Sequence, residues 1–459
     1  MSRKTIRWMF FLFFCLALAG PLAFGQEPKA PSLDAAQKQA IVDEISTLLN
    51  KNYIFADTAK KLEDVLRAKL KSGEFDKLND ARQFAGAISG TLLDVGKDRH
   101  MGFAFDPEQA ADIRRIMGQS EEERGKVRER QLQAARRDNF GFRKVEQLPG
   151  NIGTIDFRSF QSPARAGETA VAAMNFLAYC DAIIVDLRQN GGGDPAQIQL
   201  ISSYFFAEPA HLNDLYYRAG DTTENYWTLP YVPGPKAVNA DLYILTSGRT
   251  FSGAEEFTYN MKNLKRATVI GETTGGGAHP TDEMIVHEDF ILRVPIGRAI
   301  NPVSKTNWEG TGVTPDIAVP AVEAFDKAYA LAVEKLAAKA SDPERKSAYD
   351  WILTGMKAKA NPPRVDEKTL KTYVGVYGER KVSFENGTLF YQRTGPKYRL
   401  VPLTGTLFAA EGLDYFRVEF VVKGGKAVEI IGIYDNGTRD SSPRTNTNAI
   451  KEVTMYERH

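Results

Sequence analysis

The spacing of apolar residues changes along the chain and divides it into parts. Between residues 33 and 95 these residues recur every three or four positions, as at Ile41 and Ile45, which predicts amphipathic helices. From about residue 151, short apolar runs such as 182–187 alternate with helical stretches. Alternating strands and helices indicate an α/β fold with mainly parallel strands.

The last part of the chain, residues 365–459, has a third pattern. Short runs of alternating apolar and polar residues are broken by Asn-Gly and Gly-Gly pairs, which are strong hairpin signals. We expect a separate all-β domain, a small barrel, preceded by a helix and linker at 341–364. Between the helical and α/β parts lies a charged stretch at 107–150, which favours a solvated helix. A lid or substrate-guiding element over a site is the alternative.

The N-terminus carries a targeting signal. Arg3, Lys4 and Arg7 precede an apolar run that is too short for a membrane span of about 20 residues and that Pro21 interrupts. Small residues follow, as signal peptidase requires. We therefore expect residues 1–25 to be a cleaved signal peptide, and the mature protein to be periplasmic or secreted with no stable membrane span.

Charge and cysteine content exclude several classes of function. The chain has 59 basic and 58 acidic residues and no basic block, so a nucleic-acid partner is not expected. Signal cleavage would leave Cys180 as the only cysteine, which excludes an intramolecular disulfide. No His, Cys, Asp or Glu cluster has metal-ligand spacing, and the HExxH pattern is absent. Neither a metal nor another cofactor is expected.

Two segments place reactive groups at the ends of predicted strands. The glycine-rich segment 186–193 follows a buried strand, where glycines can expose backbone N–H groups to a ligand; a plain tight turn is the alternative. Ser252 stands between a predicted strand and a predicted helix, where a serine commonly caps the helix. A nucleophile there would gain from the helix dipole and from the free N–H of Gly253.

Four motifs occur in a fixed order: Asp-Leu-Arg-x-Asn-x-Gly-Gly, Thr-Ser-x-x-Thr-x-Ser-x-Ala-Glu, Ile-Gly-Glu-Thr-Thr-Gly-Gly-Gly-Ala-His and Gly-Thr-Gly-Val-Thr-Pro-Asp. This combination resembles the tail-specific (C-terminal processing) serine protease family, which includes tricorn-type peptidases and interphotoreceptor retinoid-binding proteins. The likeness is close over 150–320 and loose in the helical N-terminus. It implies a crotonase/ClpP-like core of stacked ββα units and an acyl-serine mechanism with Ser252 as nucleophile. It further implies an oxyanion hole formed by the N–H groups of Gly253 and Gly192.

Two histidines are candidates for the general base, one of them implied by the resemblance. One branch of the family uses a lysine, which is missing from 274–278, so the chain is more similar to the tricorn-type branch. That branch implies His100 as base and Glu309 as its acidic partner, with Arg99 where the branch has a serine. His279 is the alternative base. The structural alternatives are a partly buried strand residue for the first histidine and a surface carboxylate for the glutamate.

These features predict an exported serine-type endopeptidase that hydrolyses peptide bonds in unstructured or C-terminal segments of proteins. A more general endopeptidase or oligopeptidase fits as well, because the segment after Phe105 lacks the strands of a tail-binding PDZ domain. A non-catalytic protein that binds apolar ligands such as retinoids or fatty acids on the same fold is the alternative. The predicted organisation is a signal peptide at 1–25, a helical N-terminal domain at 26–106, a charged insert or lid at 107–150, a protease core at 151–340, a helix and linker at 341–364 and a small β-barrel-like domain at 365–459.

Overall fold

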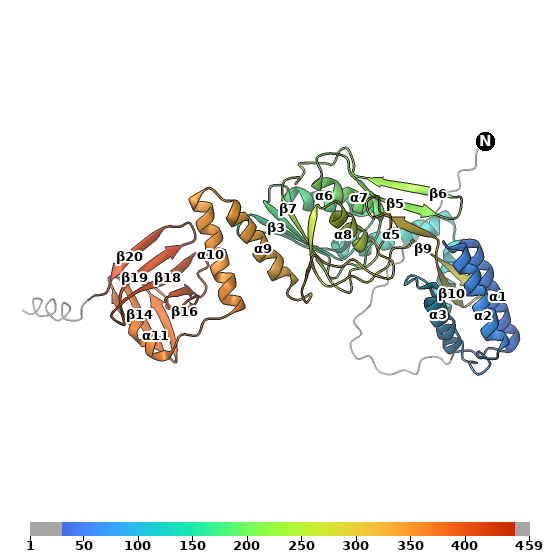
Figure 1. The fold of residues 1–459 in the computed structure, drawn as a ribbon, viewed down its shortest axis with the longest axis horizontal. Coiled ribbons are helices and arrows are strands. Elements are labelled where there is room, and N and C mark those ends of the chain that lie inside the picture. The colour runs from blue at the N-terminus through green and yellow to red at the C-terminus, as the bar shows by residue number, and fades with distance from the viewer. Residues whose placement is uncertain (1–29, 446–459) are drawn as a thin grey trace, which may run out of the picture. The chain divides into compact units, whose positions relative to one another are not determined.

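The computed structural model describes residues 30–445, so the expected signal peptide lies outside the described residues. Figure 1 shows the elements in chain order. Within the described residues the chain forms two compact units, one with the residues up to 147 and 152–328, the other with 148–151 and the residues from 329 on. In the described part of the chain, none of the helices combines the length and apolar character that a membrane-spanning segment requires.

Three helices form the N-terminal part of the first unit, as the spacing of apolar residues predicted. They are α1 (Ala35–Asn52), α2 (Ala56–Lys71) and α3 (Ala81–Gly96). Asp34 and Asp80 cap α1 and α3 by accepting hydrogen bonds from first-turn N–H groups. The helices share a buried apolar core.

A small sheet ties these helices to residues much later in the chain. It contains β1 (Gly102–Phe105), β10 (Phe290–Pro295) and β9 (Thr281–Val286), in that order. The last two strands form a hairpin and pair antiparallel. Strand β1 also pairs antiparallel with β10, which places the turn before β1 beside the segment before β9.

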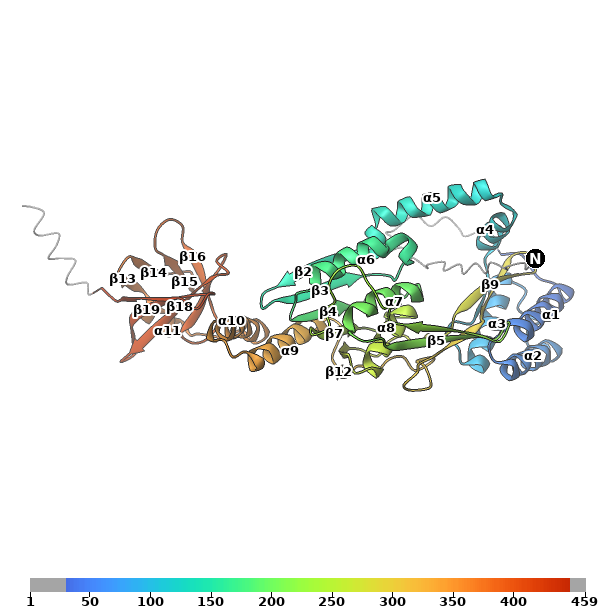
Figure 2. The ribbon, with the colours of Figure 1, turned by 90° about the horizontal axis from the view of Figure 1, so that it is seen from above.

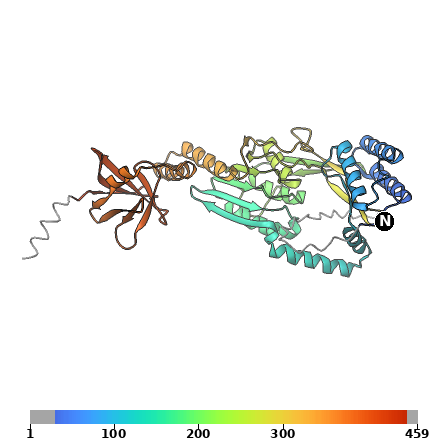
Figure 3. The same cartoon turned by 90° about the horizontal axis from the view of Figure 1, so that it is seen from below.

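The charged stretch forms two helices and a strand. Helix α4 (Pro107–Gly118) is followed by α5 (Glu121–Arg137), which buries none of its residues, in agreement with a solvated helix. Figures 2 and 3 show α5 along the outer side of the first unit. After the 3-10 turn η1 (Asn139–Gly141), β2 (Phe142–Leu148) is the edge strand of the central sheet, although the sequence analysis placed it within the insert.

The central sheet has six strands in the order β12-β8-β7-β4-β3-β2, and the first five are parallel. Parallel strands end at the same edge, so the loops that follow β4 and β7 lie together there. Those two loops carry the glycine-rich segment and Ser252. The strands are β3 (Ile152–Phe157), β4 (Ala182–Asp186), β7 (Asp241–Thr246), β8 (Ala267–Gly271) and β12 (Ile317–Ala318).

Three helices pack on the central sheet through one core. Alternate strand residues such as Ile155, Ile183 and Ile244 share this core with α6 (Pro163–Leu177), α7 (Pro195–Ser202) and α8 (Gly253–Asn263). The residues between them point to the other face and are buried as well, which is expected of parallel strands that are covered on both faces. The 3-10 turn η2 (Ser203–Phe205) follows α7.

A third sheet of the first unit contains β11 (Gly297–Ile300), β5 (His211–Tyr217) and β6 (Thr222–Trp227). Strands β11 and β5 pair antiparallel and place Arg298 opposite Tyr216.

The C-terminal part follows α9 (Ala324–Lys339), α10 (Pro343–Ala360) and α11 (Glu367–Tyr373). Eight strands pair antiparallel in chain order, and a bridge between Tyr377 and Arg444 nearly closes the sheet. The predicted fold class, an α/β core with a helical N-terminal part and a barrel-like β domain, is confirmed. The strands are β13 (Gly375–Tyr377), β14 (Arg380–Glu385), β15 (Thr388–Gln392), β16 (Tyr398–Pro402), β17 (Leu407–Ala410), β18 (Phe416–Lys423), β19 (Lys426–Tyr434) and β20 (Arg439–Pro443).

Candidate active site

Ser252 occupies a sharp turn between β7 and α8. Its backbone has φ 51° and ψ −121°, a conformation that is strained for a residue with a side chain. Such strain persists only where the surroundings hold the backbone. Here three hydrogen bonds tie the turn to the loop after β4: Ser247 Oγ donates to Arg188 O at 2.6 Å, Thr250 Oγ1 to Leu187 O at 2.8 Å and Phe251 N to Asn190 O at 3.1 Å.

Glu255, in the first turn of α8, is a second support of the serine turn. Its buried carboxylate accepts a hydrogen bond from Ser252 N at 2.9 Å, and others from Gly276 N at 2.7 Å and Gly277 N at 2.9 Å. The Thr274 hydroxyl donates to the same carboxylate. In the sequence, Ser-x-x-Glu before a helix is a capping-box signal that could have placed Glu255 at this turn. The carboxylate therefore joins the serine turn to the glycine run after β8.

The glycine-rich loop lies against the first residue of α8. A Cβ on Gly192 would fall 2.5 Å from Gly253 N, so no larger residue fits there without movement. The Gly192 N–H, which the resemblance implied as an oxyanion donor, instead donates to Asn190 Oδ1 at 2.9 Å. Among the described residues, neither Gly193 N–H nor Gly253 N–H has an acceptor. A Cβ on Gly253 would lie 2.8 Å from Gly193 N, so these two free donors are neighbours.

Asp186 and Arg188 stabilise the start of this loop. The Arg188 guanidinium donates to both carboxylate oxygens of Asp186, at 2.8 and 2.5 Å, and to Ala321 O at 2.7 Å. The sequence analysis had no means of placing the last contact, because its partner is 133 positions away.

His100 reaches the same region from the turn between α3 and β1. Its Nδ1 lies 3.6 Å from Glu309 Oε2, an ion-pair distance that is longer than a hydrogen bond. Its ring centroid is 4.8 Å from that of Phe251, the residue before Ser252. A Cβ on Gly277 would be 2.4 Å from His100 Cε1, so a glycine is needed for the imidazole to lie here. Within residues 30–445, no hydrogen bond joins Ser252 to His100.

Glu309 is not a free surface carboxylate. Its side chain is 11 % exposed, and its oxygens accept hydrogen bonds from Arg99 N at 2.9 Å and Ala278 N at 2.6 Å. Burial alone would raise the pKa of Glu309, but His100, His279 and the two backbone donors outweigh it and hold the pKa well below its usual value. Glu309 is therefore an anion beside two imidazoles.

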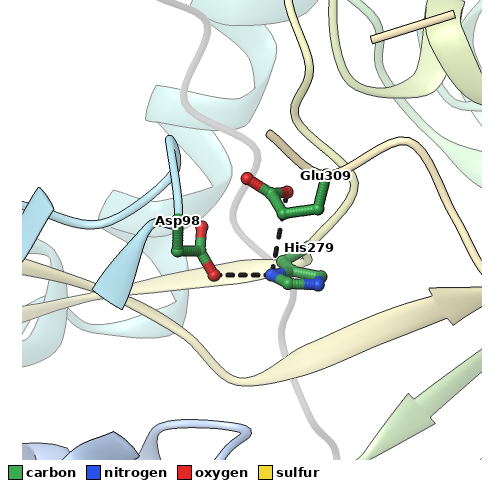
Figure 4. Close-up of side chains that lie close together, drawn as sticks. All are labelled: Asp98, His279 and Glu309. Carbon is green, nitrogen blue, oxygen red and sulfur yellow. Dashed lines mark hydrogen bonds and ion pairs between the residues drawn. The ribbon is translucent and has the colours of Figure 1, made fainter. Parts of the chain in front are cut away.

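His279 belongs to the same cluster but has a different partner. Its Nδ1 lies 2.5 Å from Asp98 Oδ2 and 3.7 Å from Glu309 Oε2, and Figure 4 shows the ring between the two carboxylates. Asp98 Oδ1 accepts the backbone N–H of His100 at 3.0 Å. The structure thus brings together both candidate bases and the predicted carboxylate. Asp98 was not among the candidate residues that the sequence indicated.

Asp98, His279 and Glu309 could also be considered as metal ligands. Each offers one ligand atom, and the three atoms lie within 4.8 Å of one another. However, Asp98 Oδ2 is bonded to His279 Nδ1, and both oxygens of Glu309 accept backbone N–H groups. A metal would have to displace these bonds, so the geometry describes a hydrogen-bonded cluster and not a prepared metal centre.

Similarity to solved structures is low. A structure described as a peptidase from Parabacteroides merdae is 19 % identical, with 62 % of this chain and 90 % of that chain covered and a TM-score of 0.45. A lipoprotein from Streptococcus agalactiae is 14 % identical, with 68 % and 100 % covered and a TM-score of 0.41. The photosystem II D1 C-terminal processing protease is 14 % identical, with 62 % and 93 % covered and a TM-score of 0.40. TM-scores below 0.5 establish no relationship by themselves.

Two family models match the sequence. Residues 151–319 match the model of peptidase family S41, which confirms the resemblance that the four ordered motifs indicated. Residues 32–132 match the model of the N-terminal domain of peptidase S41 in eukaryotic IRBP. The two models together match more than half of the chain, in the order and positions of the helical part and the central sheet. The chain belongs to peptidase family S41.

Proposed function

We propose that this peptidase is a serine-type endopeptidase in which Ser252 is the nucleophile and His100 the general base. The observation that carries the proposal is the orientation of His100. Its Nδ1 faces Glu309, and its ring packs on the residue before Ser252. In a serine triad the carboxylate pairs with Nδ1 and leaves Nε2 for the serine proton.

The reaction follows from these positions. Nε2 of His100 takes the proton of Ser252 while Oγ attacks the peptide carbonyl, and the imidazolium then returns the proton to the leaving amine. Water hydrolyses the acyl-serine by the same proton path. Glu309 stabilises the imidazolium during both steps. A hydrogen bond between serine and imidazole is often absent without substrate, so its absence here does not oppose the assignment.

The oxyanion formed during attack needs donors that are not otherwise used. Gly253 N–H and Gly193 N–H meet this condition, whereas Gly192 N–H is bonded to Asn190. The implied pair of Gly253 and Gly192 therefore gives way to Gly253 and Gly193. Backbone N–H donors that are free and held in place beside the serine can stabilise the negative oxygen of a tetrahedral intermediate.

His279 is the weaker candidate for the base. Its Nδ1 is bonded to Asp98, its ring packs on Phe55, and its contacts do not include the serine turn. We assign His279 a structural role as the buried hydrogen-bond partner of Asp98.

Labelling with a fluorophosphonate probe tests the assignment. We expect the purified protein to be labelled and to cleave an unfolded protein. Ser252→Ala should lose both labelling and cleavage, and in His100→Ala both should be strongly reduced. His211→Ala is the matched control, because His211 also pairs with an acid, Asp214, but lies on β5 outside the cluster. Normal labelling of His100→Ala with loss in His279→Ala would transfer the role of base to His279. No labelling and no cleavage by the unchanged protein would favour the apolar-ligand carrier.

The substrates we propose are unstructured or C-terminal segments of exported proteins. The proposal that the protein is exported rests on the basic and apolar N-terminus and on the small residues before position 26. Expression in a bacterium followed by mass measurement of the purified protein tests it. A mass that lacks the first 25 residues is expected, and an intact N-terminus would contradict export by this signal.

A further inference from the structure

A cavity of about 350 Å³ adjoins the cluster of Asp98, His279 and Glu309. Its other walls include Tyr53 and Phe55, from the link between α1 and α2. This link is fixed to the core, because Arg218 Nη1 donates to Tyr53 O at 2.7 Å and Ile54 N donates to Pro295 O at 2.9 Å. The cavity therefore has a defined shape, and Glu309, the proposed partner of the base, forms part of its wall.

The positive and the negative side chains around the cavity differ in whether they have bonding partners. Lys97, Arg298 and Lys305 line it, and none of these cations has a hydrogen bond or ion pair with a described residue. The two carboxylates that line it, Asp98 and Glu309, are both engaged with histidine and with backbone N–H groups. An anion that entered the cavity would meet three unpaired positive charges.

Arg298 is held in place without an acidic partner. Its guanidinium lies 5.8 Å from the centroid of Phe55 and 5.6 Å from that of Tyr216, its cross-strand neighbour. Aromatic faces orient a guanidinium but do not use its N–H groups. Phe55 also packs on His279, at 5.6 Å between ring centroids, so the arginine and the histidine are held by one ring.

Lys305 sits on an ordered turn at the same cavity. Its N–H donates to Asn301 O at 2.9 Å, and Asn301 N donates to Thr306 O at 2.9 Å. Asn301 Oδ1 also accepts hydrogen bonds from Val303 N and Ser304 N. The backbone that carries this cation is therefore fixed, whereas its ammonium group is exposed.

We propose that this cavity binds a carboxylate of the peptide substrate, with Arg298 as its main ligand and Lys97 and Lys305 as supporting charges. A guanidinium with free N–H groups matches a carboxylate in a bidentate arrangement. The carboxylate is either the C-terminus of the substrate or an Asp or Glu side chain. The proposal rests on the proposed function for its substrate, but binding does not require that Ser252 reacts.

The binding test uses Ser252→Ala protein and fluorescein-labelled hexa-alanine in four forms. These are the free acid, the C-terminal amide, and two amides that carry Glu or Gln at the fourth position. Fluorescence anisotropy should show the free acid or the Glu peptide binding about tenfold more tightly than its neutral counterpart. The pair that shows the difference identifies the source of the carboxylate. Equal curves for all four peptides at every concentration would overturn the proposal.

Variants then assign the difference to the cavity. Arg298→Gln should abolish it, and Arg293→Gln, which removes an exposed arginine that pairs with Glu283 on the neighbouring strand, should retain it. Lys305→Asn is a second variant, because asparagine tolerates the φ of 60° at this position, and it should reduce the difference roughly twofold to fivefold. An unchanged difference in both cavity variants would refute the assignment.

The two proposals fail in distinguishable ways. Fluorophosphonate labelling of the unchanged protein reports the nucleophile and does not involve the cavity. Labelling together with equal binding of all four peptides would remove only the carboxylate site. Discrimination without labelling would retain the site and remove the serine mechanism.

Discussion

Asp98 Oδ2 lies 2.5 Å from His279 Nδ1, and the two side chains are 2 % and 3 % exposed. The other oxygen of Asp98 accepts the backbone N–H of His100 at 3.0 Å. A single carboxylate thus fixes the ring of one histidine and the backbone of the other. The proposed base is positioned by a residue that need not touch the substrate.

Replacing Asp98 with asparagine should destabilise the fold. Asn keeps the shape but removes the charged acceptor of the hydrogen bond to His279 Nδ1, and leaving a buried hydrogen-bonding group without its partner costs about 1–3 kcal/mol, or more where a charged group is involved. Urea unfolding should show a loss of about 3 kcal/mol, and labelling of Ser252 should slow because the turn that carries His100 loosens. The double variant Asp98→Asn/His279→Asn should lose less than the sum of the single variants. Additive losses would mean that the pair is not coupled.

Gly192→Ala should inactivate the protein while the neighbouring Gly191→Ala does not. The new Cβ at position 192 would fall 2.5 Å from Gly253 N, one of the proposed oxyanion donors, whereas position 191 has no heavy atom within 4 Å of a new Cβ. Losing one oxyanion donor typically slows such reactions about 10²–10³-fold. Fluorophosphonate labelling rates measure the effect. Equal rates for the two variants would exclude the proposed position of the oxyanion.

Glu309 should make the protein sensitive to acid. Its pKa in the folded protein lies below the ordinary value of 4.5, so its contribution to stability is complete above that value and is lost as the pH falls through the folded pKa. The advantage of the unchanged protein over Glu309→Gln in unfolding free energy should therefore shrink from about pH 5 to about pH 3. Urea unfolding at several pH values measures it. A constant difference would mean that this carboxyl is not perturbed.

The arrangement of the central sheet was predictable from the sequence because its signals are local. Strand runs, glycine positions and the serine before α8 place Ser252 and the glycine-rich loop at one edge of a parallel sheet. The helices of the N-terminal part were predictable from spacing in the same way. The order of the four motifs then indicated the family.

The contacts that complete the site were not predictable, because they join distant parts of the chain. Asp98 and His279 are 181 positions apart, and the pairing of β1 with β10 that unites them has no periodic signal. The choice between Gly192 and Gly193 depends on one bond to the Asn190 side chain, which only a structure can show. The bond of Glu255 to the serine turn had a local signal, the capping-box spacing, whereas its bonds to Gly276 and Gly277 had none.

The effect of pH on the stability that Glu256 contributes should be opposite to the effect for Glu309. It is 5 % exposed on α8, and its pKa is raised from 4.5 to about 7, mainly by burial. The neighbouring Asn213 side chain opposes the shift, and the charge of Asp194 adds to it. A carboxyl with a raised pKa keeps its proton in the folded state and must give it up inside the protein as the pH rises.

At high pH, Glu256→Gln should therefore be more stable than the unchanged protein. Between about pH 4.5 and about pH 7 the unchanged protein should lose stability relative to the variant, by at most about 3 kcal/mol, and the difference should then level off. Urea unfolding of both proteins at pH values on either side of this range measures it, with circular dichroism spectra to show that the folds agree. The amide imitates the protonated acid, so the two proteins should have similar stability at the acid end. A variant that is less stable at every pH would show instead that the carboxylate is ionised and satisfied in the folded protein.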